Sequence, residues 1–132
     1  MRLLLDTQVL LWTLAEPRRL DREARATIES GDTEVLFSAA SIWEIAIKAS
    51  LRRDDYAFDP AEIAQAALDT GFSELAVRIS AAALVAQLPL LHRDPFDRIL
   101  IAQAMAEPAT LYTADAQLVP YSDLVRRIGA RT

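Results

Sequence analysis

Cysteine is absent from the chain, which excludes disulfide scaffolds, thiolate zinc sites, iron–sulfur clusters and thiol nucleophiles. Histidine occurs once, as His92, so a histidine-rich zinc site cannot be built. The three glycines, Gly31, Gly71 and Gly129, lie far apart in the sequence. This spacing excludes the GxGxxG dinucleotide loop and the GxxxxGK[ST] phosphate loop.

Long apolar runs are also missing, and none reaches the roughly 18 residues that a membrane span needs. Asp6 interrupts the apolar N-terminal run, and no small-residue cleavage site follows it, so no export signal is expected. Together with the absence of cysteine, this pattern predicts a cytoplasmic protein with no membrane partner.

The composition is that of an ordinary globular domain, with 132 residues, 52% hydrophobic and 25% charged. This length predicts a single domain over residues 1–132. A net charge of −5 argues against bulk attraction to nucleic acid. Lys48 is the single lysine among 14 basic residues. The excess of arginine reflects either genome composition or a use for bidentate phosphate contacts, and composition alone does not separate the two.

Apolar periodicity and turn residues predict strands that alternate with helices. Strands or extended segments are expected at residues 2–6, 34–37, 72–75, 110–113 and 124–128. Helices are expected at 7–16, 21–30, 61–70, 80–87 and 95–106, with a polar loop at 52–60 and a helical turn at 115–118. A further helix, capped by Ser38 or Ser41, is expected to end at about Leu51. This alternation predicts an α/β fold with a central parallel sheet of four to five strands and helices on both faces.

Acidic residues recur where the predicted strands end or the following helices begin. Asp6 follows the first strand, and Asp115 follows the strand at 110–113. Glu44 lies on the helix after the second strand, and Asp94 and Asp97 open the helix at 95–106. Because ligands bind beyond the carboxyl ends of parallel strands, we expect these acids to meet in one cleft.

Each of these acids also has a purely structural interpretation. Asp6 and Asp94 suit helix N-caps, and Asp97 suits a capping box. Asp115 suits a first helical turn, and Glu44 can pair with Lys48 four residues later. If the acids do share a cleft, their mutual repulsion calls for a divalent cation. Oxygen ligands without thiol or histidine point to Mg²⁺ or Mn²⁺.

Four segments, DTQVLLW, SIWEIAIK, HRDPFDRILIAQA and LYTAD, occur in this order between Arg2 and about Tyr121. In order and separation they resemble the PIN-domain ribonucleases, and more narrowly the VapC-like toxins of bacterial type II toxin–antitoxin pairs. The resemblance implies a three-layer α/β/α fold, Mg²⁺- or Mn²⁺-dependent cleavage of RNA by an activated water, and products with a 5′-phosphate and a 3′-hydroxyl. It also implies inhibition by a cognate antitoxin and a homodimer.

The resemblance assigns site residues by matching positions. The implied catalytic quartet is Asp6, Glu44, Asp97 and Asp115, with Asp6 and Asp97 as the chief metal ligands. Thr7 and Thr113 match hydroxyl positions that orient the acids, and Asp94 is an outer acid or the helix cap. Two positions depart from the family: Gln8 replaces a histidine of close relatives, and Gln117 and Leu118 follow Asp115 where some members carry a further acid.

Several residues could bind the substrate or a partner. The candidates for a basic rim, each of which also suits a solvated helix face, are Arg18, Arg19, Arg22, Arg25, Arg93 and Arg98. His92 is either a general base or a hydrogen-bonding loop residue. Trp12 and Trp43 favour core or interface packing over base stacking. We expect their helices to form an apolar groove for an antitoxin segment that reaches the acids with an arginine.

Other functions fit the sequence less well. A haloacid-dehalogenase-type phosphatase needs a second acid two residues after the first, where this chain has Gln8. A signalling receiver module needs a lysine at the end of a late strand, whereas Lys48 lies on an early helix. An RNA-processing nuclease without a toxin role, or a domain retained for binding alone, stay open alternatives.

Overall fold

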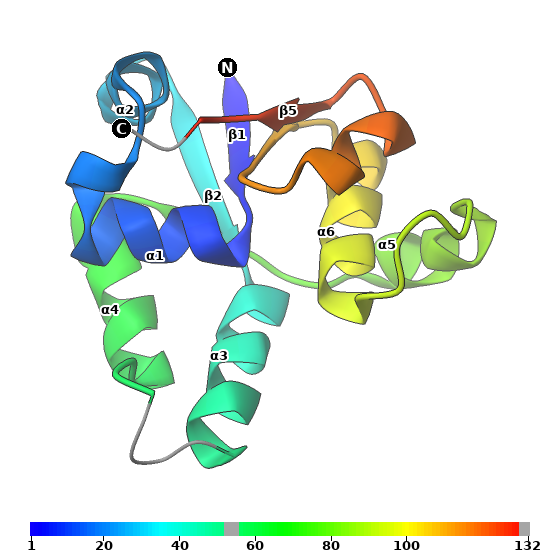
Figure 1. Cartoon of the computed structure of the whole chain (residues 1–132), viewed down its shortest axis with the longest axis horizontal. Helices are drawn as coiled ribbons and strands as arrows, with labels where there is room; N and C mark the ends of the chain where they lie inside the picture. The colour runs from blue at the N-terminus through cyan, green and yellow to red at the C-terminus, as the bar shows by residue number, and fades with distance from the viewer. Residues whose placement is uncertain (52–55, 130–132) are drawn as a thin grey trace.

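Five parallel strands form a single sheet in the residues that the computed structural model describes, 1–51 and 56–129 (Figure 1). Their order across the sheet is β3-β2-β1-β4-β5. The strands are β1 (Arg2–Leu5), β2 (Glu34–Ser38), β3 (Ser73–Leu75), β4 (Thr110–Thr113) and β5 (Val125–Arg127). Leu4 of β1 pairs with Leu36 of β2 on one side and with Leu111 of β4 on the other. The predicted parallel sheet is therefore confirmed.

Helical segments connect the successive strands of the sheet. The α-helices are α1 (Thr7–Ala15), α2 (Arg22–Glu29), α3 (Ala39–Leu51), α4 (Pro60–Thr70), α5 (Ile79–Leu84) and α6 (Pro95–Ala106). The 3-10 turns are η1 (Pro17–Arg19), η2 (Val85–Gln87) and η3 (Ala116–Tyr121). Among these helices α4 shows both end signals: Asp59 caps it before Pro60, and Gly71 ends it at a φ of 100°, which a glycine adopts readily.

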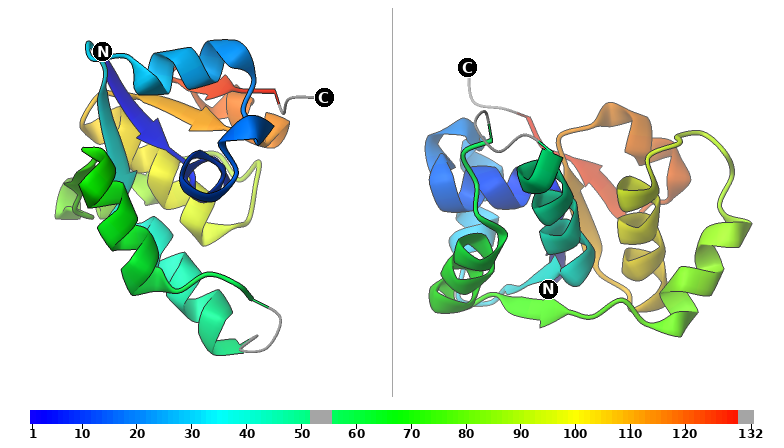
Figure 2. Two further views of the ribbon diagram at one scale, coloured as in Figure 1. Left: turned by 90° about the vertical axis from the view of Figure 1, so that its left-hand side faces the viewer. Right: turned by 90° about the horizontal axis from the view of Figure 1, so that it is seen from below.

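Alternate residues of each strand feed two separate cores. Leu3 and Leu5 of β1 pack with α1, α2 and α4, whereas Leu4 between them packs with α5 and α6 on the other face. All three side chains are fully buried, which stabilises the fold by roughly 1.5–3 kcal/mol for each. Figure 2 shows the sheet between these two helical layers. The domain therefore has the predicted three-layer α/β/α architecture.

Helices α3 and α4 form an arm beside the sheet. They run side by side away from it in the left view of Figure 2. The polar loop expected at 52–60 lies partly outside the described residues, and α4 begins at Pro60. None of the helices in ranges 1–51 and 56–129 has both the length and the apolar character needed to cross a membrane.

The helix expected at 80–87 is shorter in the structure. It ends at Leu84 and continues as the 3-10 turn η2. The guanidinium of Arg98 explains the change, because its Nη2 donates hydrogen bonds to the carbonyls of Val85 and Leu88 at 3.1 and 3.4 Å. Such carbonyl contacts satisfy the last turn without a regular helical continuation.

The order of the strands locates the expected ligand site. From β1 the chain proceeds outward to β2 and β3, and then returns to the opposite side of β1 to form β4 and β5. The order therefore reverses between β1 and β4. In open α/β sheets the crevice beyond the carboxyl ends of the strands at such a point is where ligands bind.

Candidate active site

A cleft of about 620 Å³ opens at the carboxyl ends of β1 and β4. The acidic and hydroxyl side chains predicted for the site line it together. They are Asp6, Thr7, Glu44, Asp94, Asp97 and Asp115. Thr113 is buried at the end of β4, beneath this cleft. The structure thus brings the sequence-predicted acids to one place.

Asp6 follows β1 and caps α1. Its Oδ1 accepts a hydrogen bond from the backbone N–H of Val9 at 2.8 Å, and the residue is only 5% exposed. Burial raises the pKa of Asp6 to about 6, the negative charge of Asp97 adds to the effect, and hydrogen bonds from Thr113 and Val9 oppose it. The capping role and the place in the acidic cleft therefore coexist.

Asp97 lies in the first turn of α6, three residues after the residue that caps this helix. The cap is Asp94, whose Oδ1 accepts from the backbone N–H groups of Phe96 and Asp97 at 2.8 and 3.3 Å. Burial raises the pKa of Asp97 to about 6, and the charge of Asp94 adds to the rise, whereas the hydrogen bond to His92 lowers it. A cation between these acids would offset their mutual repulsion, which adds to the effect of burial on both pKa values.

Glu44 is buried on α3 at 8% exposure and is held by two neighbours. Its Oε1 lies 2.7 Å from Oγ1 of Thr7, which lies 2.9 Å from Oγ of Ser41. Because a carboxylate only accepts, Thr7 donates to Glu44 and accepts from Ser41. Oε2 of Glu44 accepts from Nζ of Lys48 at 2.8 Å. The predicted Glu44–Lys48 pair is therefore present inside the cleft, with Lys48 on its wall.

Asp115 reaches the cleft from the turn after β4. Its backbone N–H donates to Oγ1 of Thr113 at 3.0 Å, and its Oδ1 accepts from the N–H of Gln117 at 2.9 Å. These two contacts fix the turn and leave Oδ2 facing His92. Thr113 therefore orients the backbone that carries Asp115.

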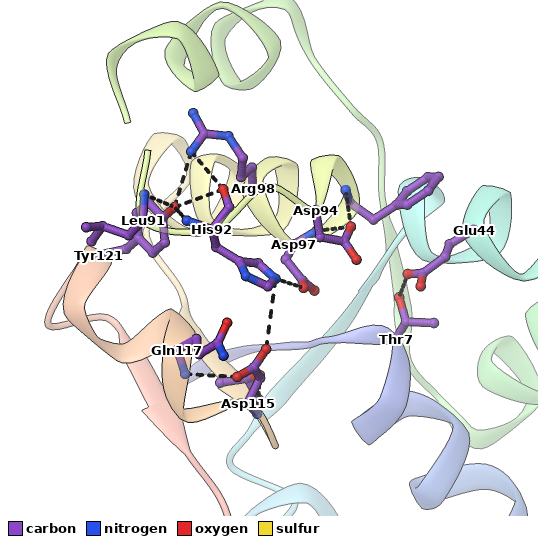
Figure 3. A network of polar contacts seen from close by, with 12 residues as sticks. Thr7, Glu44, Leu91, His92, Asp94, Asp97, Arg98, Asp115, Gln117 and Tyr121 are labelled. Atoms are coloured by element: carbon purple, nitrogen blue, oxygen red, sulfur yellow. Dashed lines mark hydrogen bonds and ion pairs between the residues drawn. The ribbon is translucent and has the colours of Figure 1, made fainter. Parts of the chain in front are cut away.

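His92 is a site residue that the sequence interpretation undervalued. Its Nε2 lies 2.9 Å from Oδ2 of Asp97 and 3.9 Å from Oδ2 of Asp115 (Figure 3). The sequence signal was its position five residues before Asp97, across the turn that Asp94 and Pro95 make at the start of α6. That turn folds the chain back and brings the imidazole over the acids.

Two of the expected rim arginines lie at or beside the cleft. Arg19 lines it, with its guanidinium carbon 4.9 Å from the centre of the Trp12 ring and Nη1 3.5 Å from Glu16. Arg93 lines an adjoining hollow beside Glu44. These side chains bring positive charge to the edge of a negative cleft.

The other four arginines do not line the cleft. Arg98 points into the protein, where its Nη1 donates to the carbonyl of Pro89 at 2.9 Å and contacts the Tyr121 hydroxyl at 3.2 Å. Its predicted role in substrate binding is corrected to that of a residue that holds the segment before α6. Arg18 is exposed on η1 outside the cleft. Arg22 and Arg25 lie on α2, near the amino end of β1 (Figure 1).

The two tryptophans have different environments, which corrects the expected groove. Trp12 is 7% exposed and belongs to the core, whereas Trp43 is 64% exposed. Trp43 packs edge-to-face on Phe96, with ring centres 5.2 Å apart. An apolar hollow of about 400 Å³ does lie beside Trp43, between α3, α5 and α6. Helix α1, which carries Trp12, does not line this hollow, and Trp12 packs into the core that α1 shares with α2 and α4.

The donor set of the cleft fits a divalent cation. Carboxylate oxygens are the ligands that Mg²⁺ and Mn²⁺ prefer, and two of the acids carry raised pKa values from burial and mutual repulsion. The side-chain ligand atoms of His92, Asp94 and Asp97 lie within 4.8 Å of one another. A cation bound by these residues would offset the negative charges of the two neighbouring carboxylates, Asp94 and Asp97.

The fold and the site define an α/β/α domain with a carboxylate-lined cleft at the switch point of its parallel sheet. The chain belongs to the PIN domain family, since the sequence profile of that family matches residues 3–123. PIN domains are in general metal-dependent nucleases. This finding confirms the family resemblance of the four sequence segments.

Solved structures support the same fold. One similar structure is that of VapBC2 from Rickettsia felis bound to a DNA fragment from its promoter. A chain of that structure superposes with a TM-score of 0.70 at 13% sequence identity, and the match covers 97% of this chain and 99% of that one. A chain of FitAcB from Neisseria gonorrhoeae superposes with a TM-score of 0.61 at 20% identity, covering 95% of each. No curated protein sequence matches the chain significantly.

Proposed function

We propose that this protein is a cytoplasmic Mg²⁺- or Mn²⁺-dependent endoribonuclease that acts as the toxin of a toxin–antitoxin pair. The observation that supports it most is the convergence of four carboxylates, those of Asp6, Glu44, Asp97 and Asp115, in one cleft of a PIN domain. Burial, together with the charge of neighbouring acids, raises the pKa of Asp6 and of Asp97 to about 6, and acids perturbed in this way within a cleft are typical of functional sites.

Each acid has a defined role in this proposal. Asp6 and Asp97 would be the chief ligands of the ion, and Glu44 and Asp115 would contact its bound waters or a second ion. The ion, when bound, activates water and neutralises charge at the phosphodiester that is displaced. Thr7 holds Glu44, Thr113 holds the turn of Asp115, and Asp94 caps the helix that carries Asp97. The products expected of this reaction carry a 5′-phosphate and a 3′-hydroxyl.

RNA must approach this negative cleft along its positive edge. Arg19 and Lys48 line the cleft, and Arg93 lines the hollow next to it. We propose that these three side chains contact backbone phosphates on either side of the cleaved bond, since a phosphate contact needs only a charged donor within reach. The guanidinium of Arg19 lies over the Trp12 ring, and this contact helps to hold it at the edge of the cleft.

The antitoxin has a continuous path to the acids. The apolar hollow beside Trp43 shares Pro95 and Phe96 with a neighbouring hollow, and that hollow shares Glu44 and Asp94 with the acidic cleft. A segment with apolar side chains followed by an arginine would match this sequence of surfaces in shape and charge. VapBC2 and FitAcB, which share the fold, are toxin–antitoxin complexes.

A homodimer is the second assembly that we propose. Ile79, Leu90 and Leu91 are exposed on α5 and on the segment that follows it, and an apolar surface of this kind suits contact with a second copy. Light scattering on the purified protein tests this directly, with twice the monomer mass expected.

Expression in cells tests the toxin role. The wild type should arrest growth when it is produced alone, and co-production of its antitoxin should restore growth. Asp6→Asn should be harmless at equal protein levels, because asparagine keeps the helix cap but removes the charge. A harmless wild type that still cleaves RNA after purification would favour the RNA-processing alternative. Arrest by Asp6→Asn would show that cleavage at this site is not the cause.

A further inference from the structure

The imidazole of His92 lies beside Asp97 and Asp115, two of the acids that line the cleft. Its Nε2 is the atom that faces both carboxylates, at 2.9 Å from Asp97 Oδ2 and 3.9 Å from Asp115 Oδ2 (Figure 3). The side chain is about four-fifths buried, so its orientation is set by the protein. A single nitrogen atom thus faces two of the acids that line the cleft.

These separations suit ligands of one ion. Two ligand atoms that each lie about 2.1 Å from an ion, at right angles to one another, are about 3 Å apart. The 2.9 Å between His92 Nε2 and Asp97 Oδ2 matches this spacing, as it matches a hydrogen bond. The 3.9 Å to Asp115 Oδ2 is wider than this spacing. The imidazole need not move far to share an ion with Asp97.

Hydrogen bonds with Tyr121 and Arg98 hold the backbone of His92 in this position. The hydroxyl of Tyr121 accepts from the backbone N–H groups of Leu91 and His92, at 3.1 and 2.7 Å. Arg98 Nη1 contacts that hydroxyl at 3.2 Å and the carbonyl of His92 at 3.4 Å. Tyr121 and Arg98 therefore fix the backbone of His92 from two different elements, η3 and α6. These contacts hold the backbone that carries the imidazole in place beside the acids.

We propose that His92 is a nitrogen ligand of the metal in the acidic cleft, and that it shifts the preference of the site toward Mn²⁺ and other first-row transition ions over Mg²⁺. Imidazole binds transition ions well, whereas Mg²⁺ favours carboxylate and water oxygens. The inference rests on the proposed metal-dependent function, and it names the ion that the same site selects. It also revises the expectation of an all-oxygen site.

Pulsed electron paramagnetic resonance on bound Mn²⁺ tests this inference without RNA. His92 is the only histidine of the chain, so a ¹⁴N coupling from imidazole identifies it uniquely, provided that the protein carries no histidine tag. The wild type should show this coupling. His92→Gln should lose it, should bind Mn²⁺ about tenfold more weakly, and should bind Mg²⁺ within about twofold of the wild type.

Glutamine is the informative replacement, because its amide can still donate to Asp97. If His92 only orients Asp97, the wild-type spectrum lacks the ¹⁴N coupling and His92→Gln keeps the affinity for Mn²⁺; either result overturns the inference and leaves the proposed nuclease standing. If the wild type binds no Mn²⁺ and no Mg²⁺, the inference and the proposed function fail together. The wild-type spectrum decides the matter even if His92→Gln does not fold.

Discussion

The hydroxyl of Thr7 donates a hydrogen bond of 2.7 Å to Oε1 of Glu44, and this contact joins the first turn after β1 to helix α3. Asp6, the neighbour of Thr7, faces the same cleft. Two adjacent residues at the end of one strand therefore supply one acid and fix the position of another. The contact therefore couples the position of Glu44 to the end of β1 that carries Asp6.

Replacing Thr7 tests the importance of that contact. Thr7→Val keeps the shape of the side chain but leaves Glu44 Oε1 without its donor, and we expect RNA cleavage to fall about tenfold. Thr7→Ser keeps the hydroxyl and should retain most of the activity. Initial rates at saturating metal measure both variants. Equal rates for the two variants would show that the hydroxyl does not position Glu44.

The raised pKa of Asp6 predicts a dependence of stability on pH in metal-free buffer. The carboxyl has a pKa of about 6 in the folded protein and 3.8 as its reference value. Between these values the folded state holds more protons than the unfolded state, so the contribution of Asp6 to stability falls as the pH rises. Above about pH 6 the cost of the buried charge is complete, and it amounts to at most about 3 kcal/mol.

Asp6→Asn removes this cost, and chemical denaturation in EDTA measures the change. The free energy of unfolding of Asp6→Asn should match that of the wild type near pH ~4 and exceed it increasingly up to pH ~7. Asp21→Asn is the matched control, because Asp21 also caps a helix, α2, outside the cleft. A constant difference between Asp6→Asn and the wild type across this range would contradict the assigned pKa.

The apolar hollow beside Trp43 predicts where an antitoxin binds. Trp43→Ala should weaken antitoxin binding at least tenfold, since large exposed aromatic residues at the centre of interfaces contribute about 2 kcal/mol or more. Met105 is an exposed apolar residue at the far end of α6, and Met105→Ala should leave the affinity for the antitoxin unchanged. Calorimetric titration with the antitoxin measures both. Unchanged affinity of Trp43→Ala would remove the hollow as the docking site.

Arg19 predicts a contact with substrate phosphate. Arg19→Gln should raise the KM for RNA several-fold at an unchanged kcat and lower the salt dependence of binding by about one phosphate contact. Arg126→Gln removes the same charge from a residue that pairs with Glu23 outside the cleft, and it should have little effect. Equal effects of the two variants would show that only the net charge of the protein matters.

The layers of the fold could be predicted because they depend on local patterns. Apolar runs such as Leu3–Leu5 bury both faces of a strand, and residues such as Asp59 and Gly71 mark helix ends within a few positions. The meeting of Asp6 with Asp115 was predictable for a related reason, because the carboxyl ends of parallel strands lie at one edge of a sheet.

Contacts between distant elements could not be predicted in this way. Arg98 and Tyr121 meet across η3 and α6, and nothing in either local sequence shows that the guanidinium turns inward to bind carbonyl oxygens. The same holds for Trp12 and Trp43, which share a helical pattern of apolar neighbours. Trp12 packs into the core, whereas Trp43 stays 64% exposed. His92 contacts Asp97 only because the turn before α6 folds the chain back, and the sequence alone does not show the shape of that turn.

Cleavage of total cellular RNA by the purified protein tests the central claim most directly. The reaction is run with Mn²⁺, with Mg²⁺ and with EDTA, and Asp97→Asn is run beside the wild type. We predict cleavage by the wild type with either ion, products with 5′-phosphate ends, no cleavage in EDTA and none by a folded Asp97→Asn. Cleavage that persists in EDTA, or an Asp97→Asn variant with full activity, would contradict the assignment of the acidic cleft as a metal-dependent nuclease site.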